Sequence, residues 1–147
     1  MAGNVSRLIY ISTAKSGVTK KDVENILATA RRVNAERGIT GMLLYDSTSF
    51  MQLLEGPQDN VSKTFDEICR DGRHHNVVLI MRQTGVPRQF PNWTMGYSLL
   101  DDPRILQGEG WFPLTLSQLE KSLPAAIDPD IRVLFTSFLS VRLKESA

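Results

Sequence analysis

The sequence has few of the features that would place it in several common classes of protein. It contains one cysteine, Cys69, so no disulfide can form within the chain. It has no basic-then-apolar leader, and no apolar run approaches the roughly 18 residues that a membrane-spanning helix needs. We therefore expect a cytoplasmic, soluble protein with no membrane partner.

An excess of charge of one sign is also missing. Lys and Arg together number 17 and Asp and Glu 16, which gives a net charge of +1. Proteins that bind the phosphate backbone normally carry a clear basic excess, so we expect no nucleic-acid partner. The 147 residues are enough for one domain and an appendage, since domains typically hold about 100–150 residues.

Sequence patterns for catalysis and metal binding are missing as well. There is no glycine-framed serine and no glycine loop that could cradle a phosphate. His74 and His75 adjoin each other at a predicted helix-to-strand junction, and Cys69 has no second pair of metal ligands nearby. We expect Cys69 to be a small core residue. The sequence thus predicts neither an enzyme nor a metal site.

What the sequence does contain is an alternation of strand and helix patterns up to residue 100. The predicted strands are residues 8–12, 39–45, 50–55, 77–81 and 93–100, and the predicted helices run from Thr19 to Gly38 and from Gly56 to Gly72. Two strand–helix–strand units that share a hairpin, with right-handed crossovers, place both helices on one sheet face. The prediction is an α+β, ferredoxin-like fold with an added fifth strand.

The pattern changes after residue 100, where breakers precede two predicted helices at 117–123 and 129–143. We therefore divide the chain into a domain at 1–100 and a two-helix extension at 101–147. An apolar stripe lies on the last helix, at Leu134, Phe135, Phe138 and Leu139. We expect part of it to cover the sheet face left open by the other helices, and the rest to serve a homo-oligomer or a partner.

Two amide side chains stand where apolar residues are expected. Asn34 continues the apolar stripe of the first predicted helix, four residues after Ala30, and Gln52 alternates with Phe50 and Leu54 on one strand face. Both positions predict burial, and a buried polar group without a partner costs roughly 1–3 kcal/mol. Two such amides in one small domain indicate a bound molecule with hydrogen-bonding groups of its own.

The predicted topology brings these amides toward one place. The first and third strands are central neighbours, so Tyr10 and Gln52 should lie side by side, facing the helices that carry Ile26, Asn34 and Ile68. Each polar residue alone has a structural explanation, such as a hydroxyl that reaches a backbone carbonyl or an amide that caps a helix end. Together with Ile26 and Ile68, however, they would form a slot with aliphatic walls, a hydrogen-bonding floor and one phenol. Such a slot suits a flat ring with polar edges.

Five segments of the chain, in this order and spacing, resemble the BLUF domains, the blue-light sensors that use FAD. They are residues 7–12 (RLIYIS), 34–45 (NAERGITGMLLY), 50–57 (FMQLLEGP), 71–74 (DGRH) and 90–96 (FPNWTMG). The agreement extends over roughly residues 5–100, and several motifs together are far more specific than one. The remainder resembles the two-helix extension of short, stand-alone members of the family.

The resemblance implies a flavin bound non-covalently between the two helices, above the sheet. Ile26 and Ile68 would flank its ring system, Asn34 would hold the pyrimidine-side edge, and Gln52 would bridge the flavin and Tyr10. In the family, the tyrosine gives an electron and a proton to the light-excited flavin through the glutamine, whose rearranged amide shifts the flavin absorption to the red.

Further site residues follow from the same resemblance. The matching positions near the ring edge or ribityl chain are Asp71, Arg73 and His74. Trp93 and Met95 match the fifth-strand pair of which one or the other lies near the glutamine. The change would pass through this strand and the C-terminal helices to a signalling protein of unknown identity.

Two positions depart from the family pattern, Val33 where many members have a polar residue and Glu67 where arginine is common. Both leave FMN or riboflavin as alternatives to FAD. The rival function is a light-independent, ferredoxin-like adaptor that binds a protein through its terminal helices. An acyl-phosphate hydrolase on the same fold is a weaker alternative, because no arginine-bearing phosphate loop follows the first strand.

Overall fold

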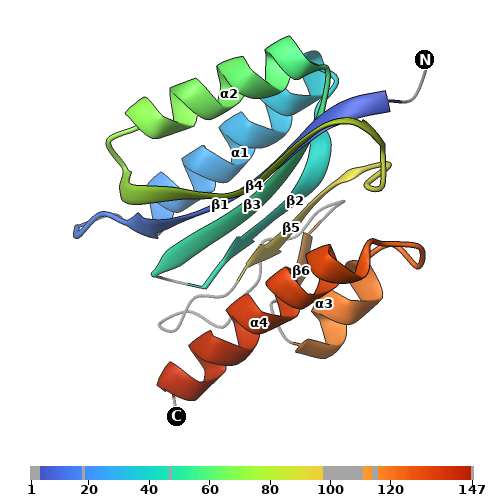
Figure 1. Ribbon diagram of the computed structural model, residues 1–147. Coiled ribbons are helices and arrows are strands. Elements are labelled where there is room, and N and C mark those ends of the chain that lie inside the picture. The colour runs from blue at the N-terminus through green and yellow to red at the C-terminus, as the bar shows by residue number, and fades with distance from the viewer. Residues whose placement is uncertain (1–3, 18, 47, 98–110, 114–115, 147) are drawn as a thin grey trace.

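The computed structural model describes residues 4–17, 19–46, 48–97, 111–113 and 116–146 (Figure 1). In chain order the elements are β1 (Asn4–Ala14), α1 (Lys20–Glu36), β2 (Thr40–Tyr45), β3 (Ser49–Gly56), α2 (Gln58–Arg70), β4 (His74–Pro87), β5 (Trp93–Tyr97), β6 (Trp111–Pro113), α3 (Leu116–Ser122) and α4 (Pro129–Ser146). None of the helices in these residues is long and apolar enough to span a lipid bilayer.

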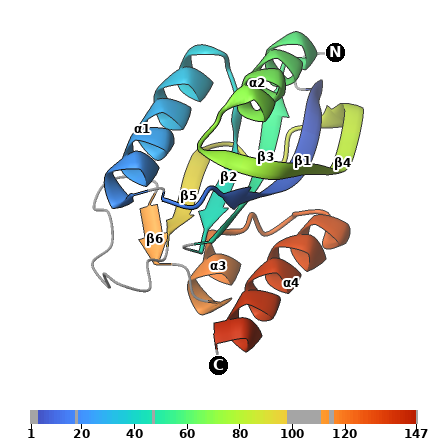
Figure 2. The ribbon, with the colours of Figure 1, turned by 90° about the vertical axis from the view of Figure 1, so that its left-hand side faces the viewer.

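The strands form one sheet in the order β4-β1-β3-β2-β5-β6. The first four are antiparallel neighbours, while β5 runs parallel to β2 and β6 runs parallel to β5. Helices α1 and α2 cover one face of this sheet, and α3 and α4 cover the other (Figures 1 and 2). The predicted ferredoxin-like α+β fold, with an added fifth strand and C-terminal helices, is confirmed.

Helix α1 begins and ends at the residues that its sequence signals indicate. Thr19 Oγ1 accepts a hydrogen bond from Asp22 N at 3.1 Å, and Asp22 Oδ2 accepts one from Thr19 N at 2.9 Å, which makes a capping box. Beyond the helix, Gly38 adopts a φ of +67°, a conformation that glycine takes without strain. These signals fix where α1 begins and ends, and its buried side contains Leu27 and Asn34, each 1% exposed.

The C-terminal helices bury the sheet face opposite α1 and α2. Ile9, Met42, Leu44, Met51 and Leu53 of the sheet form one cluster with apolar residues of α3 and α4. The α4 members are Ile131, Phe135, Phe138 and Leu139, with Leu134 packed against them. The predicted packing of the α4 stripe is therefore confirmed. Phe135, Phe138 and Leu139 are buried in this cluster and Leu134 is half-buried, so little of the stripe is left for a second subunit, and the expected homo-oligomer stays a prediction.

The prediction that Cys69 is a core residue is also wrong, because its side chain is exposed. The inward stripe of α2 consists of Val61, Phe65 and Ile68. Successive helical residues are turned by about 100° from one another, so the residue after Ile68 points away from the sheet.

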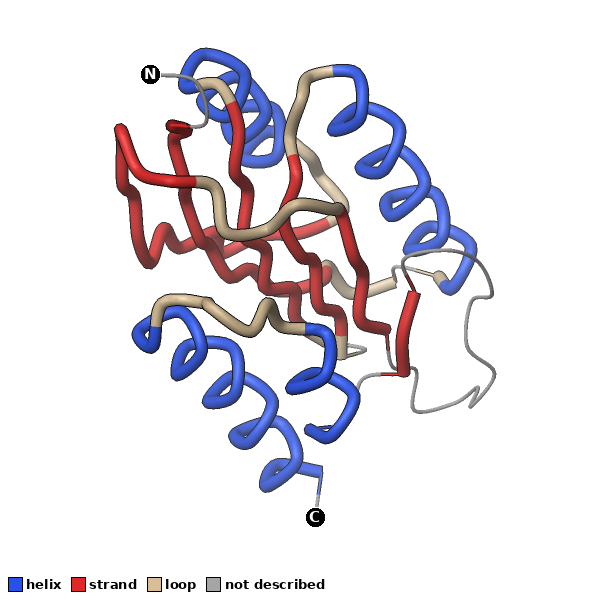
Figure 3. The backbone as a smooth tube through the Cα atoms, turned by 90° about the vertical axis from the view of Figure 1, so that its right-hand side faces the viewer, coloured by secondary structure: helices blue, strands red, loops and turns tan. Residues whose placement is uncertain are grey.

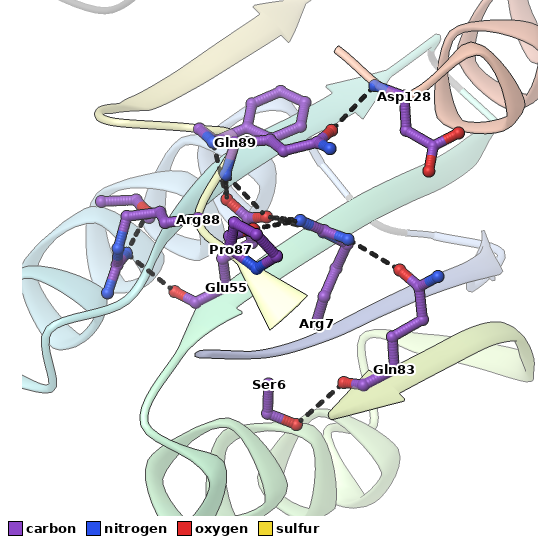
Figure 4. A network of polar contacts seen from close by, with 10 residues as sticks. Ser6, Arg7, Glu55, Gln83, Pro87, Arg88, Gln89 and Asp128 are labelled. Atoms are coloured by element: carbon purple, nitrogen blue, oxygen red, sulfur yellow. Dashed lines mark hydrogen bonds and ion pairs between the residues drawn. The ribbon is translucent and has the colours of Figure 1, made fainter. Parts of the chain in front are cut away.

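A buried ion pair lies on the same sheet face as the C-terminal helices (Figure 4). The side chains of Arg7 on β1 and Glu55 on β3 are 2% and 0% exposed, and Arg7 Nε donates to Glu55 Oε2 at 2.6 Å. Glu55 Oε1 also accepts from the backbone N–H groups of Gln89 and Phe90, at 3.0 and 2.6 Å. The carboxylate thus fixes the segment that leads from β4 into β5.

This network continues to the C-terminal extension. The Gln89 side chain accepts through Oε1 a hydrogen bond of 2.9 Å from the backbone N–H of Asp128, just before α4 (Figure 4). On the other side, Arg7 Nη1 donates to Gln83 Oε1 at 2.7 Å and Nη2 donates to the Pro87 carbonyl at 2.8 Å. One guanidinium and one carboxylate therefore connect β1, β3, β4 and the start of α4.

Candidate functional site

A pocket lies between α1, α2 and the sheet face that they cover. Every residue predicted to bind the cofactor lines it: Tyr10, Ile26, Asn34, Gln52, Ile68, Asp71, Arg73 and His74. They come from β1, α1, β3, α2, the connection between α2 and β4, and the first residue of β4. The fold thus brings together residues that are up to 64 positions apart in the sequence, from Tyr10 to His74.

The floor of the pocket is formed by Tyr10 and Gln52. These residues face each other in the β1–β3 register, and the Tyr10 hydroxyl donates a hydrogen bond to Gln52 Oε1. Both side chains are buried, each 3% exposed. Burial raises the pKa of the Tyr10 phenol far above its usual range, so the phenol keeps its proton in the resting protein.

Asn34 presents a hydrogen-bond donor that the protein leaves unpaired. The residue is 1% exposed and lines the pocket, and its Nδ2 has no partner among the described residues. Its backbone carbonyl, by contrast, accepts from Ile39 N at 2.9 Å. Since a buried donor without an acceptor costs about 1–3 kcal/mol, this amide calls for an acceptor on a bound molecule.

Aliphatic side chains form the walls of the pocket. Ile26 and Val33 come from α1, Ile68 from α2 and Leu43 from β2. Apolar walls above a floor with few polar groups are typical of sites for small ring systems, in which the polar groups set the orientation. Val33, which departs from the family pattern, adds to these walls and offers no hydrogen bond.

His74 uses both of its ring nitrogens within the protein. Nε2 lies 2.7 Å from the Ile68 carbonyl, and Nδ1 lies 2.7 Å from Ser12 Oγ. A carbonyl can only accept, so Nε2 donates to Ile68, and Nδ1 shares a hydrogen bond with the Ser12 hydroxyl. His74 therefore ties the end of α2 to β1 and positions Ile68, with no free nitrogen for a ligand.

The charged groups at the pocket are paired with one another. Arg73 Nη2 lies 2.7 Å from Asp71 Oδ2, a hydrogen bond that lowers the pKa of Asp71 and raises that of Arg73. Glu67 lies across from Arg37, which donates to both of its oxygens at 2.9 and 3.0 Å. Sequence patterns did not indicate a role for Arg37, because its partner Glu67 is 30 residues away, on α2.

The fifth strand continues the row of residues that contains Gln52. Gln52 pairs with Leu43, and Leu43 pairs with Met95 in the parallel β2–β5 register. Trp93 pairs with Gly41 in the same ladder. The side chains of Trp93 and Met95 lie outside the described part of the structure, but their backbone positions place Met95 two strands from Gln52.

The chain is similar to known light-responsive proteins. A family described as sensors of blue light using FAD, or BLUF, matches residues 5–96. The blue light- and temperature-regulated antirepressor BluF of Escherichia coli is 35% identical over 86 residues, which are 58% of this chain and 21% of that protein. A photoactivated adenylate cyclase subunit beta of Euglena longa is 38% identical over 92 residues, 62% of this chain and 11% of that protein.

Solved structures show the same similarity. BlrB, a BLUF protein in its dark state, is 30% identical with a TM-score of 0.58, over 65% of this chain and 72% of that one. BlrP1 of Klebsiella pneumoniae, solved with FMN and cyclic diGMP, is 28% identical with a TM-score of 0.68, over 92% of this chain and 34% of that one. The chain thus spans about a fifth or less of the two curated relatives described above and a third of BlrP1.

Proposed function

The chain belongs to the BLUF family of blue-light sensors that use FAD, and we propose that its Tyr10–Gln52 pair turns light absorbed by a bound flavin into a signal. The observation that carries this proposal is the hydrogen bond from the buried Tyr10 phenol to the Gln52 amide at the floor of the pocket. A phenol that keeps its proton at rest, and that contacts an amide able to reorient, is suited to give up an electron and a proton in the light and to take both back afterwards.

The residues of the pocket fit a flavin. The unpaired Asn34 Nδ2 requires an acceptor, and the carbonyl groups on the pyrimidine side of an isoalloxazine supply one. Ile26 and Ile68 would pack against the two faces of the flat ring, while Gln52 would meet its polar edge. Asp71, Arg73 and His74 would frame the ring edge, and the hydrogen bonds between Asp71 and Arg73 and from the His74 ring to Ile68 and Ser12 would keep this frame rigid.

When bound, a flavin supplies absorption of blue light and, in its excited state, a strong oxidant. Tyr10 would give an electron to this oxidant, which would make its phenol strongly acidic, and the Oη proton would move along the existing hydrogen bond to Gln52 Oε1. When the electron and proton return to Tyr10, the Gln52 amide is left in a changed hydrogen-bonding arrangement. The cycle has no net reaction, so the protein acts as a sensor.

The output runs through the fifth strand. A change in the hydrogen bonds of Gln52 would alter its contacts along the row of paired residues Gln52, Leu43 and Met95. Trp93 lies two residues before Met95 on β5. Strand β5 leads toward residues 101–147, which we propose act as an extension of the flavin-binding domain at 1–100. The signal then reaches a downstream protein, as the names of the relatives, an antirepressor and a cyclase, suggest for longer chains.

We infer that the site recognises the ring system of the flavin more than its phosphates. Arg73, the arginine among the described lining residues, is held by Asp71, and Glu67 adds an acidic group that Arg37 neutralises. No unpaired cation among the described lining residues is left to bind phosphate. FAD is the cofactor named for the family, and FMN or riboflavin should be able to replace it.

The decisive experiment is a visible absorption spectrum of the purified protein, loaded with FAD, before and after blue light. We expect the bands of oxidised flavin and a red shift that reverses in the dark, because Gln52 changes its hydrogen bond to the flavin and no covalent bond forms. A fully loaded protein whose spectrum does not shift would contradict the photosensor mechanism even though flavin is bound.

Asn34→Ala should weaken flavin binding by about 1–3 kcal/mol, or about 5- to 150-fold in Kd, because the unpaired donor in the pocket is removed. Fluorescence titration of the apoprotein with FAD measures this Kd. The matched control is Asn60→Ala, since Asn60 Nδ2 already donates to the Arg37 carbonyl at 2.9 Å and does not line the pocket. Equal affinities for the two variants would place Asn34 outside the binding site.

A further inference from the structure

Strand β4 exposes a run of apolar side chains at the edge of the sheet. Val78, Leu79 and Ile80 are 49%, 42% and 41% exposed, and they are consecutive in the sequence. β4 is the outermost strand beside β1, and no described residue pairs with its outer edge (Figure 3). A group of exposed apolar residues on an unpaired edge is typical of a surface that another chain covers.

A bulge explains why three consecutive residues are exposed together. Ile9 pairs with Met81 and Tyr10 with Leu79, so Ile80 is an extra residue on β4. The bulge interrupts the alternation that would otherwise send every second side chain into a covered face. Val77 and Met81 pack partly against the clusters under α2 and the C-terminal helices, while the three residues between them stay exposed.

We propose that a second copy of this chain covers this edge, with β4 lying antiparallel to its own copy around a two-fold axis at Leu79. A two-fold contact requires a surface that is complementary to itself. Residues 77–81 (VVLIM) are all apolar, so a reversed copy sets an apolar residue against each of them.

The charges beside this run are compatible with the same pairing. Counted residue by residue from an axis at Leu79, Asn76 corresponds to Arg82 of the second copy and His75 to Gln83, so no two cations occupy corresponding positions. The net charge of +1 adds little repulsion between two copies. The other apolar stripe that could have served, on α4, is already buried within the chain.

The dimer should be weak and reversible. A stable interface buries about 800 Å² on each partner, more than a short edge segment provides. The β4 ladder is also irregular at three places along β1, which limits the length of a continuous intermolecular ladder. The association therefore depends on protein concentration, and it needs no light.

Sedimentation velocity of the flavin-loaded protein over a wide concentration range tests the proposal. We expect the mass to rise from that of the 16.5 kDa chain toward twice that value, and the double variant Val78→Lys/Ile80→Lys to stay monomeric with an unchanged flavin spectrum. The matched control is Val133→Lys, because Val133 on α4 is 60% exposed and lies outside the proposed interface. A parent protein that stays monomeric, or a double variant that dimerises as the parent does, would overturn it.

Cross-linking gives a second readout that does not depend on lysine substitutions. In a Cys69→Ser background, Leu79→Cys should form an intermolecular disulfide under mild oxidation, since residues on the axis come within the Cα separation of about 4.4–6.8 Å that a disulfide requires. Val133→Cys in the same background should form no intermolecular disulfide. Cross-linking at residue 133 and not at residue 79 would refute the β4 interface.

Discussion

Replacing Tyr10 with phenylalanine should abolish the light-induced red shift and leave the flavin bound. The ring keeps its volume and its packing against Phe65, whose centroid lies 5.7 Å away, so the pocket should retain its shape. The hydroxyl that donates to Gln52 is lost, and with it the group that releases an electron and a proton. Difference spectra before and after blue light, with transient flavin fluorescence, measure both effects.

Another buried tyrosine provides the matched control. Tyr45 on β2 is 4% exposed and its ring packs on Phe50 at 4.6 Å, but it does not line the pocket. Tyr45→Phe should keep the red shift, whereas Gln52→Leu should lose it because the amide is gone. If Tyr10→Phe quenches excited flavin as fast as the parent and still forms the shifted state, Tyr10 is not the electron donor.

The largest loss of stability is expected for Glu55→Ala. Removal of one partner of a buried ion pair leaves an uncompensated charge, here on Arg7, and typically costs about 3–5 kcal/mol. The backbone N–H groups of Gln89 and Phe90 would lose their acceptor as well. Urea unfolding followed by circular dichroism should show the midpoint fall accordingly.

Two further variants separate charge burial from general disruption. Glu67→Ala removes an ion pair whose Glu67 side chain is 46% exposed, and it should cost less than about 1 kcal/mol. The double variant Arg7→Met/Glu55→Leu removes both buried charges and should recover only part of the loss, because the two N–H groups remain unpaired. Equal losses for Glu55→Ala and Glu67→Ala would show that burial of the pair has no energetic weight.

Local signals and strand order were enough to predict much of the site. The capping residues and the glycine beyond α1 fix the helix ends, and the four-residue steps from Ile26 through Ala30 indicate the inward position of Asn34. The strand–helix order implies that β1 and β3 are neighbours, and this was sufficient to place Tyr10 beside Gln52. Such features depend on periodicity and connectivity, which a single sequence displays.

Long-range polar pairs could not be predicted in the same way. Arg7 and Glu55 are 48 residues apart in the sequence. The residues around each of them look the same as those around a charged side chain on the exposed face of a strand. Strand β6 has only three residues among predicted breakers, too few for a periodic signal. Strand β4 spans His74–Pro87, well beyond the predicted 77–81, because its bulges interrupt the alternation that sequence patterns rely on.

The position of β1 has a consequence for synthesis on the ribosome. β1 is translated before β3 and β4, yet it lies between them, and its Asn4 pairs with Pro87. At about 5–20 residues per second, roughly 4–15 s separate the translation of β1 from that of the end of β4. During that interval the apolar segment Leu8–Ile11 has no complete ladder. The second ladder of β1 can therefore form only after every residue that lines the pocket, up to His74, has been translated.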